Sequence, residues 1–386
     1  MVPVRYNVRS LVVRKITTLA TAGGIALVVF VFAAAQMLGE GAQRAMVSSG
    51  RPDNVIVLRK GSDAELPSGI SNDFKKLGDR PEVAQVAGVG AIGEIVIVIT
   101  AERADGSGAI SNVLVRGTSP EGMAFRPEVK IVSGRAPKPG TNEVIIGKAI
   151  SGRFKDFGPG QRFEIRRNRP LEVVGEFTAA GSSYESEVWG DLDVIRKYLG
   201  RESVVSSVRI RLTDPSKFEA YRMAVEGDKS FSVKAMREHD YFQKQSEGLS
   251  GFLTGFGMVI AILFSIAAML GAAITMNGAV ANRSKEIGTL RALGFSRRSI
   301  LLSFVLEAVA LALAGGVIGL VFVMLLSLVS FPVMNFQTFS EIIIGFHASP
   351  EIVMSALIFS VIMGLLGGLF PAIRASRVSP VEAMRA

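Results

Sequence analysis

The chain has 386 residues, 49% of them hydrophobic, and its mean hydropathy is +0.38. This hydropathy is high for a soluble protein and low for a chain wholly buried in lipid, so the composition favours a few membrane spans joined to a sizeable soluble part. Cysteine is absent, which excludes disulfides, zinc–thiolate sites and thiol nucleophiles. The formal net charge is +9, but the basic residues flank apolar runs, so the sequence predicts no nucleic-acid binding.

The N-terminal segment, residues 1–15, is basic and leads into the first apolar run, residues 16–38, which carries no charge. A cleaved signal peptide is the alternative interpretation. However, the run is longer than the ~7–15 residues of a signal-peptide core, and the sequence continues in a helical manner as far as Arg44. The sequence therefore predicts an uncleaved, cytoplasmic-to-outside transmembrane helix at residues 16–38.

Residues 39–247 form the only large segment between apolar runs, and their pattern indicates a mixed α and β domain. Short β-branched runs bounded by Gly, Pro or Asp predict strands, and Asp214 is the predicted N-cap of the last helix. Turn clusters around several of the strands indicate a β-rich subdomain at about residues 125–190. The predicted strands are residues 55–58, 94–99, 113–115, 144–146, 163–165, 171–174 and 208–212, and the predicted helices are residues 72–77, 195–199 and 215–225.

Three more apolar runs follow this domain. Residues 248–281 are uncharged over about 34 positions, or ~50 Å of helix. The hydrocarbon core is only about 30 Å thick, so this helix is predicted to project outside the membrane as a stalk. The third span is predicted at residues 299–331 and the fourth at residues 352–373, ending near Pro371. The remaining segments are residues 282–298, 332–351 and 374–386.

Lysine and arginine are concentrated before the first run, between the second and third, and after the fourth, whereas residues 332–350 contain none. The positive-inside rule then places both termini and residues 282–298 in the cytoplasm. The predicted fold class is a membrane α-helical protein with four transmembrane helices and a large α+β extracytoplasmic domain that contains a β-rich subdomain.

Glycine pairs with small-xxx-small spacing occur in the second, third and fourth runs. Because lipid provides no hydrophobic drive between helices, close backbone approach at glycine is a main source of helix association. The three pairs together predict a packed bundle that includes a dimer partner. They are Gly251 and Gly255, Gly315 and Gly319, and Gly364 and Gly368.

Residues that could carry chemistry are few. The two histidines, His239 and His347, lie far apart in sequence, so neither a histidine metal site nor a catalytic triad is expected. Trp189, the only tryptophan, is interpreted as a core residue. Glu307 lies in the third run, where a carboxylate facing lipid is unfavourable, so it is predicted to face the bundle with a structural partner. The sequence predicts no catalytic residue and no metal site.

The segment 282–298 contains a short amphipathic helix. Ile287, Leu290 and Leu293 lie on one side of it, and basic residues lie around the other. Gly294 is predicted to end this helix, and Ser296 to cap the next one. Composition alone leaves two interpretations open: an interfacial helix held by anionic lipid, and a helix that docks on a partner.

The same segment closely resembles the signature of the FtsX/MacB-like ABC permeases, the type VII or mechanotransmission family. The resemblance covers nearly the whole chain and implies that the amphipathic helix is a coupling helix, which docks on an ATPase. The matching strings are Arg283-x-Lys285-Glu286-Ile287-Gly288-Thr289-Leu290-Arg291-Ala292-Leu293-Gly294, Ser303-Phe304-x-x-Glu307-Ala308 and Phe370-Pro371-Ala372-x-x-Ala375-Ser376-Arg377. The coupling role falls on Lys285, Glu286, Ile287, Gly288, Thr289, Leu290, Arg291 and Leu293.

The resemblance also implies partners. They are a second permease copy, in a homodimer or related heterodimer, and two copies of an ABC ATPase that uses ATP and Mg²⁺. No G-x-x-x-x-G-K-[ST] string is present, so the ATPase is expected to be a separate subunit, and the permease is expected to be no enzyme and to bind no cofactor. A periplasmic adaptor or substrate protein and membrane lipid are further expected partners. The expected location is the bacterial inner membrane, with the large domain in the periplasm.

The leading functional interpretation is a permease that couples ATP hydrolysis to a conformational change of its periplasmic domain. Export or extraction of a lipophilic or lipoprotein cargo, or efflux with an adaptor, would fit. The alternative is an FtsX-like regulator of periplasmic cell-wall enzymes, or a membrane signalling scaffold without transport. A secondary transporter is disfavoured, because such proteins usually have more spans and more polar residues near the membrane midplane.

Overall fold

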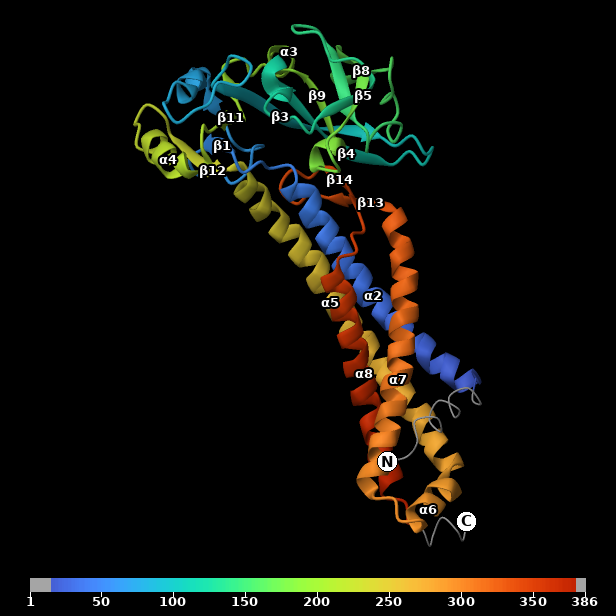
Figure 1. Ribbon diagram of the computed structural model, residues 1–386. Helices are drawn as coiled ribbons and strands as arrows, with labels where there is room; N and C mark the ends of the chain where they lie inside the picture. Colours follow the sequence, from blue (N-terminus) through green and yellow to red (C-terminus); the bar gives the residue numbers. More distant parts are fainter. Residues whose placement is uncertain (1–14, 380–386) are drawn as a thin grey trace. The chain divides into compact units, whose positions relative to one another are not determined.

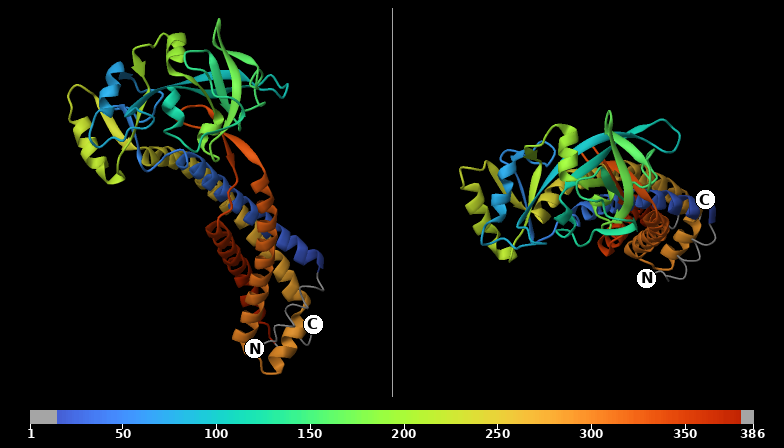
Figure 2. Two further views of the ribbon diagram at one scale, coloured as in Figure 1. Left: turned by 45° about the horizontal axis from the view of Figure 1, so that its top comes forward. Right: turned by 90° about the horizontal axis from the view of Figure 1, so that it is seen from above.

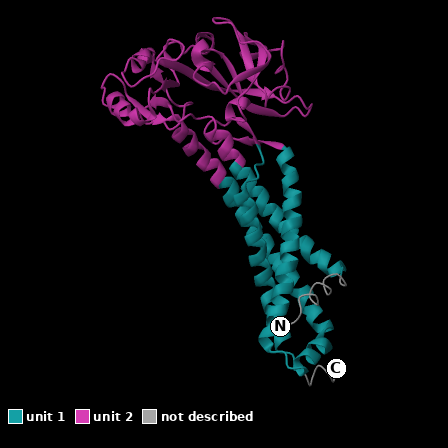
Figure 3. Cartoon of the chain, in the orientation of Figure 1, with its two compact units in different colours: residues 1–40, 252–329, 345–386 teal, residues 41–251, 330–344 magenta. Residues whose placement is uncertain are grey.

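The computed structural model describes residues 15–379. Within this range the chain forms two compact units (Figure 3). Unit 1 comprises residues 15–40, 252–329 and 345–379, and unit 2 comprises residues 41–251 and 330–344. Two of the boundaries fall inside long helices, so each of these helices contributes residues to both units.

Unit 1 is a bundle of long helices with one short helix at the end of the bundle, seen from three sides in Figures 1 and 2. Within residues 15–379, four helices are long and apolar enough to cross a membrane, one for each predicted span. The long helices are α2 (Lys15–Val47), α5 (Glu238–Asn282), α7 (Arg297–Met324) and α8 (Pro350–Ser376), and the short one is α6 (Ser284–Ala292).

The interior of unit 1 is made of aromatic, aliphatic and small side chains that face one another across the helices. Phe32 of α2 stacks on Phe359 of α8, with ring centroids 4.5 Å apart. Ala261 of α5 and Ala312 of α7 are fully buried in the same cluster. Side chains of this size allow the helix backbones to approach closely, which is how helices associate in lipid.

Three helices are longer than predicted, and the first of them, α2, continues past residue 38 to Val47. α5 begins at Glu238 rather than at residue 248, because its first turns are polar and belong to unit 2, where an apolar run gives no signal. α8 does not end at Pro371 but continues to Ser376. Proline removes one helical hydrogen bond there. The last turn is nevertheless retained, since Ala372 and Ala375 pack in a buried cluster.

The segment after α7 forms a hairpin where a continuous span and a loop were predicted. α7 ends at Met324, and a 3₁₀ turn, η5 (Leu325–Leu328), precedes strand β13 (Ser330–Met334). Strand β14 (Glu341–Gly345) pairs with β13. Apolar residues continue through this boundary, so hydropathy alone extends the span to residue 331 and conceals the change from helix to strand.

Unit 2 is built on one large, mostly antiparallel sheet. Its strand order is β12-β1-β11-β3-β4-β9-β6-β8-β5, with β7 paired to β8, and only the β4–β9 and β6–β8 pairs are parallel. Strands from the predicted β-rich subdomain continue this sheet through the β4–β9 pair. The strands are β1 (Asn54–Arg59), β3 (Ala91–Glu102), β4 (Ile110–Thr118), β5 (Lys130–Gly134), β6 (Glu143–Gly147), β7 (Arg162–Arg166), β8 (Arg169–Thr178), β9 (Glu187–Asp191), β11 (Ser207–Arg211) and β12 (Val233–Arg237). A separate small pair joins β2 (Ile70–Ser71) and β10 (Val204–Val205).

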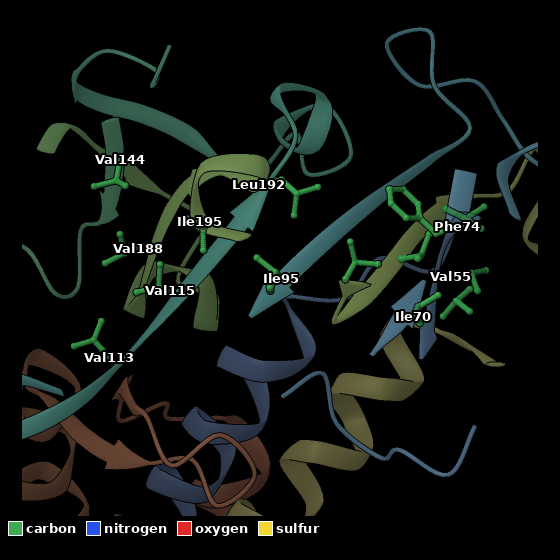
Figure 4. Packing of buried hydrophobic residues seen from close by; sticks show 14 of the residues in the cluster. Val55, Ile70, Phe74, Ile95, Val113, Val115, Val144, Val188, Leu192 and Ile195 are labelled. Atoms are coloured by element: carbon green, nitrogen blue, oxygen red, sulfur yellow. The ribbon is translucent and has the colours of Figure 1, made fainter. Parts of the chain in front are cut away.

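One face of the sheet is covered by short helices and holds the main apolar core (Figure 4). Helix α3 (Leu192–Leu199) places Leu192 and Ile195 against Ile95, Val115 and Val188 of the sheet. Helix α4 (Phe218–Glu226) covers β12, and the 3₁₀ helix η1 (Asn72–Gly78) covers β3 and β11.

The helix ends in unit 2 follow local capping rules. The Asp214 side chain accepts a hydrogen bond from the N–H of Ser216 at 2.7 Å, which confirms the predicted cap ahead of α4. Asp191 caps α3 in the same way, and Gly200 ends it in a left-handed conformation with φ 67°.

The other face of the sheet is covered by the ends of α2 and α5 that belong to unit 2. Tyr241 and Phe242 of α5 pack with Ile56 and Leu58 of β1 and with Trp189 of β9. Trp189 is 1% exposed, in agreement with its interpretation as a core residue. Alternate residues of β1 thus serve two cores, because successive strand side chains point to opposite faces.

Candidate functional sites

Helix α6, the predicted coupling helix, is held against the bundle by one face only. Ile287 is 1% exposed and packs with Ile300 and Phe304 of α7 and with Ala372 and Ala375 of α8. This contact fixes the position of α6 relative to two of the long helices of unit 1.

The predicted ends of α6 and α7 are both formed. Gly294 follows Leu293, the C-cap residue of α6, and has φ 96°, a left-handed conformation that glycine adopts without strain. The Ser296 hydroxyl accepts a hydrogen bond from the N–H of Ser299 at 3.2 Å and caps α7. The tight turn between α6 and α7 therefore follows from local sequence.

The structure divides the residues predicted to dock on an ATPase into two groups. Ile287 and Gly288 are buried against the bundle, and Leu290 and Arg291 are half-buried. Leu293 is 72% exposed and carries the apolar part of the outward face. The outward group consists of Lys285, Glu286, Thr289 and Leu293.

Arg283 links α6 to α7 from a buried position. It is the N-cap residue of α6 and is only 6% exposed. Its Nη1 lies 3.2 Å from Oε2 of Glu307 in α7, and its Nε lies 3.3 Å from Oε2 of Glu286 in α6. The guanidinium also lies 5.4 Å from the centroid of the Phe304 ring. Glu307 thus faces the bundle and has Arg283 as an ionic partner, a partner that the sequence did not identify.

The predicted glycine pairs have different surroundings. A Cβ added at Gly319 would lie 2.5 Å from the carbonyl oxygen of Ala26 in α2, and one at Gly315 would lie 2.7 Å from that of Ala22. Gly364 and Gly368 of α8 meet α7 in the same way, at Ala312 and Ala308. In contrast, a Cβ at Gly251 or Gly255 would meet no described atom within 4 Å. Two of the three pairs therefore lie at helix contacts inside the chain.

A network of buried charges lies on the α2 and α5 face of the sheet in unit 2. Arg116 forms two hydrogen bonds to Glu187, at 2.8 and 2.9 Å, and Arg126 forms two to Glu94, at 2.7 and 2.8 Å. Every member is at most 6% exposed. The charged members, called the ion network below, are Glu65, Glu94, Arg116, Arg126, Glu187, Arg209 and Glu238.

The ion network holds the first residue of α5. The carboxylate of Glu238 lies 3.1 Å from Nε of Arg209 and accepts a hydrogen bond from Nδ2 of Asn54 at 2.9 Å. It also accepts one from the backbone N–H of Arg51 at 3.2 Å. The turn after α2 is held nearby, since the hydroxyls of Ser49 and Ser183 lie 2.7 Å apart. Both long helices therefore end in buried polar contacts with the sheet and its loops.

The arginines lower the pKa values of two of the buried carboxyls, Glu65 and Glu94. Burial alone would raise the pKa of Glu65, but Arg116 and Arg209 outweigh burial and hold the pKa at about 2. The pKa of Glu94 is lowered in the same way by Arg126, Arg116 and Arg209. Burial raises the pKa of Tyr184, whose hydroxyl lies 3.4 Å from Glu238. Within residues 15–379, no group of three or more His, Asp or Glu side chains is arranged to hold a metal ion.

The sequence contained a signal for the ion network that the sequence analysis did not use. Glu94, Arg116 and Arg209 each lie in a strand between neighbours that are apolar or glycine. A charge at the position that faces a covered side of a sheet predicts a buried partner, because an isolated buried charge is very unfavourable. Glu187 and Glu238, in contrast, lie in elements that were not predicted.

A bundle with four apolar helices and a large sheet domain defines a membrane protein with a substantial domain outside the lipid. Two family models match the chain: the MacB-like periplasmic core domain over residues 18–227, and the FtsX-like permease C-terminal domain over residues 258–380. The chain therefore belongs to the FtsX/MacB family of ABC transporter permeases, and it is a membrane protein with a periplasmic domain.

Relatives with related names match at low identity. An uncharacterized ABC transporter permease of Methanocaldococcus jannaschii is 26% identical over 57% of this chain and 56% of its own length. The pyoverdine export ATP-binding/permease protein PvdT of Pseudomonas entomophila is 26% identical over 96% of this chain and 56% of its own length. The macrolide export ATP-binding/permease protein MacB of Neisseria gonorrhoeae is 25% identical over 62% of this chain and 38% of its own length. The chain thus spans roughly half the length of the curated relatives that it matches, or less.

Among solved structures, the extracellular domain of YknZ from Gram-positive bacteria matches with 16% identity. The match covers 47% of this chain and 99% of that chain, with a TM-score of 0.36.

Proposed function

We propose that the chain transmits the movements of an ABC ATPase docked on α6 to unit 2. The observation that carries this proposal is the continuity of α5. One uninterrupted helix of 45 residues begins at Glu238 in the ion network and ends at Asn282, next to Arg283 at the start of α6. A displacement of α6 would therefore act on a rigid rod whose other end is fixed in the sheet domain.

The ion network makes this end of α5 resistant to sliding. Moving Glu238 away from Arg209 would leave the buried Glu238 carboxylate without its ionic partner, a change that costs about 3–5 kcal/mol in comparable cases. A movement of α5 is then transmitted to the sheet rather than absorbed at the joint. Cytoplasmic placement of α6 and of both termini follows from the proposal.

Docking on α6 is tested by substitution on its outward face. Leu293→Asp, at the exposed C-cap residue of α6, is expected to abolish co-purification of an ABC ATPase with the chain. Ile110→Asp is the matched control, since Ile110 is similarly exposed, at 70%, but lies in β4. If the Leu293→Asp variant retains the ATPase as well as the control does, the docking role of α6 is wrong.

Transmission to unit 2 is tested by spin labels at Met223 in each copy of the complex. Met223 lies on α4 and is 67% exposed, so a label there leaves the core intact. Adding ATP and Mg²⁺ is expected to change the distance between the two labels. An ATPase that binds and hydrolyses ATP without changing this distance would favour the scaffold interpretation over coupling.

We further propose that two copies associate along α5. Only 17% of its apolar stretch is buried, against 33–44% for the other three spans. Six of its exposed apolar residues recur at alternating spacings of four and three, the period of a coiled-coil seam, while Met258, Ile262, Phe264 and Ile274 are exposed outside that seam. The seam residues, each between 49% and 61% exposed, are Phe252, Phe256, Val259, Leu263, Ile266 and Leu270.

Single cysteines test this interface without background, because the chain has none of its own. Phe256→Cys and Leu263→Cys are expected to form disulfide-linked dimers on mild oxidation in the membrane. Leu366→Cys, at an exposed position of α8, is the control and should remain monomeric. Equal cross-linking at all three positions would indicate random collision.

The cargo is proposed from chemistry and from the relatives. Two of the relatives are named for export of a macrolide and of pyoverdine. An apolar bundle closed by small residues provides no hydrophilic path, so we propose a lipophilic or lipoprotein cargo, handled with a periplasmic adaptor. Loss of export in the Leu293→Asp variant, with export retained in the Ile110→Asp control, would support this assignment.

A further inference from the structure

A small crevice of about 60 Å³ lies in unit 1, where α2, α5, α7 and α8 meet. Neither the docking of α6 nor the α5 seam makes use of it. The residues that line it are apolar or small, apart from four threonines and Glu307. Gly364 and Gly368 of α8, which contact α7, also line it. An apolar pocket with a few convergent polar groups is the usual form of a ligand site.

Two of the threonines, Thr21 and Thr275, bring their hydroxyls together in this crevice. The Oγ1 atoms of Thr21 and Thr275 lie 3.0 Å apart. Each hydroxyl has one proton, and each has a backbone carbonyl in reach at 2.9 Å, that of Thr17 or of Ala272. When both hydroxyls donate their protons to these backbone carbonyls, the two Oγ1 atoms face each other as acceptors, with no proton between them. A donor supplied by a ligand would stabilise that arrangement.

The carboxylate of Glu307 adds a negative charge to the same crevice, and its ion pair can be exchanged. Arg283 divides its guanidinium between Glu307 and Glu286. A cation that enters the crevice could take the place of Arg283 at Glu307 while Arg283 keeps Glu286. Every charge stays paired in this exchange, which matters because an unpaired charge in an apolar bundle is unfavourable.

We propose that this crevice binds a protonated amine carried on an apolar body. The ammonium group would lie at Glu307 and donate N–H hydrogen bonds to the Thr21–Thr275 pair, and the apolar body would contact Ile25 and Leu311. Because Arg283 is the N-cap residue of α6, arrival of the ligand also removes the ion pair between α6 and α7, while the Ile287 contact remains. This last step rests on the proposed docking of α6, whereas binding itself does not.

Binding is measured by photo-crosslinking of the full chain in nanodiscs that contain no aminophospholipid. The probe is a diazirine-bearing dodecylamine, and its matched controls carry a trimethylammonium or a hydroxyl head. The amine is expected to label peptides of α5 and α8 that line the crevice, with dodecylamine competing at least about tenfold better than dodecanol.

Three variants test the individual contacts. Glu307→Gln is expected to weaken labelling by the amine at least about tenfold and to leave the alcohol unchanged, since a hydrogen bond to a charged group is lost. Thr275→Val should weaken labelling by the amine probe. Labelling by the trimethylammonium probe should not change, because that probe has no N–H to donate. Ala279→Leu fills the crevice and should weaken all three probes.

Glu307→Asp keeps the charge and should keep binding, which guards against a simple folding defect in Glu307→Gln. The proposal is overturned if Glu307→Gln labels as strongly as the unchanged chain, or if Ala279→Leu has no effect. An aminophospholipid and a cargo amine share this chemistry, so phosphatidylethanolamine is added in a separate arm. Competition identifies the lipid as the occupant, and lack of competition assigns the site to a cargo amine. No ATPase is present, so failure of α6 docking would not affect the result.

Discussion

In unit 2, charged side chains from neighbouring strands meet on one covered face of a sheet, whereas in unit 1 the helix contacts are made by glycine and alanine. Strands about 4.8 Å apart bring alternate residues close together, so several arginines and glutamates can satisfy one another. Helices in an apolar solvent gain nothing from apolar burial and associate through close backbone approach instead. The two units therefore respond to substitution in different ways, and this difference can be measured.

The largest effect is expected from Glu94→Gln in the ion network. It leaves Arg126 without the carboxylate that binds both of its terminal nitrogens, so the free energy of unfolding should fall by about 3–5 kcal/mol. Trp189, the only tryptophan, is buried beside Arg126, so its fluorescence in a urea titration reports on this part of unit 2. Glu219→Gln, at an exposed pair on α4, is the control and should change stability by less than about 0.5 kcal/mol.

Acidification tests the same carboxyls without substitution. The pKa of Glu65 is about 2 in the folded chain, below its ordinary value of 4.5. The unfolded chain then binds the proton first as the pH falls, so the stabilisation is fully present above about pH 4.5 and is lost progressively toward pH 2. Urea midpoints from Trp189 fluorescence should decrease across this window. An unchanged midpoint between pH 5 and pH 2.5 would contradict the assignment.

In unit 1, the same chemical change should have opposite effects at two glycines. Gly319→Ala puts a Cβ against the Ala26 carbonyl and should destabilise the bundle by about 1–3 kcal/mol. Gly271→Ala is the matched control on α5, where an added Cβ meets no described atom within 4 Å. It should be neutral or stabilising by up to about 1 kcal/mol, because alanine favours helix. Unfolding in mixed SDS micelles, followed by circular dichroism, measures both.

The smallest effect is expected from Asp191→Ala, which removes the cap of α3. The Asp191 carboxylate accepts from the N–H groups of Asp193 and Val194, both at 3.0 Å. Loss of such a cap costs about 1 kcal/mol, well below the loss expected in the ion network. Asp193→Ala is the control, because Asp193 is the second residue of α3 and does not provide the cap. If Asp191→Ala and Glu94→Gln lower the free energy of unfolding equally, the ion network contributes no more to stability than one helix cap.

The features predicted from sequence are those that depend on local chemistry. Apolar length determines the spans because the membrane thickness is fixed. Asp214, Gly294 and Ser296 were identified as caps or stop residues because their interactions lie within a few residues. The β-branched strands of the sheet were found for the same reason.

The missing features depend on tertiary contacts. The first turns of α5 are polar and become helical where the sheet covers them, so the apolar pattern could not indicate them. Arg283 and Glu307 lie in different helices, and their pairing was not foreseen. Ile287 is buried by α7 and α8 and therefore does not belong to the docking face that was predicted for it. The periodicity of one helix cannot show which other helices will cover it.

The hairpin of β13 and β14 has a consequence for the order in which the chain is assembled. Glu341 in this hairpin forms ion pairs with Arg103 and Arg153, which lie far earlier in the sequence. During synthesis, Arg103 and Arg153 therefore cannot form these ion pairs until Glu341 has been synthesised, which happens after α7. Unit 2 can be completed only after α2, α5 and α7 have been synthesised. A fragment that stops at residue 251 would lack β13 and β14, which belong to unit 2. Quality control by the cell could then distinguish a chain whose bundle has inserted from one whose bundle has not.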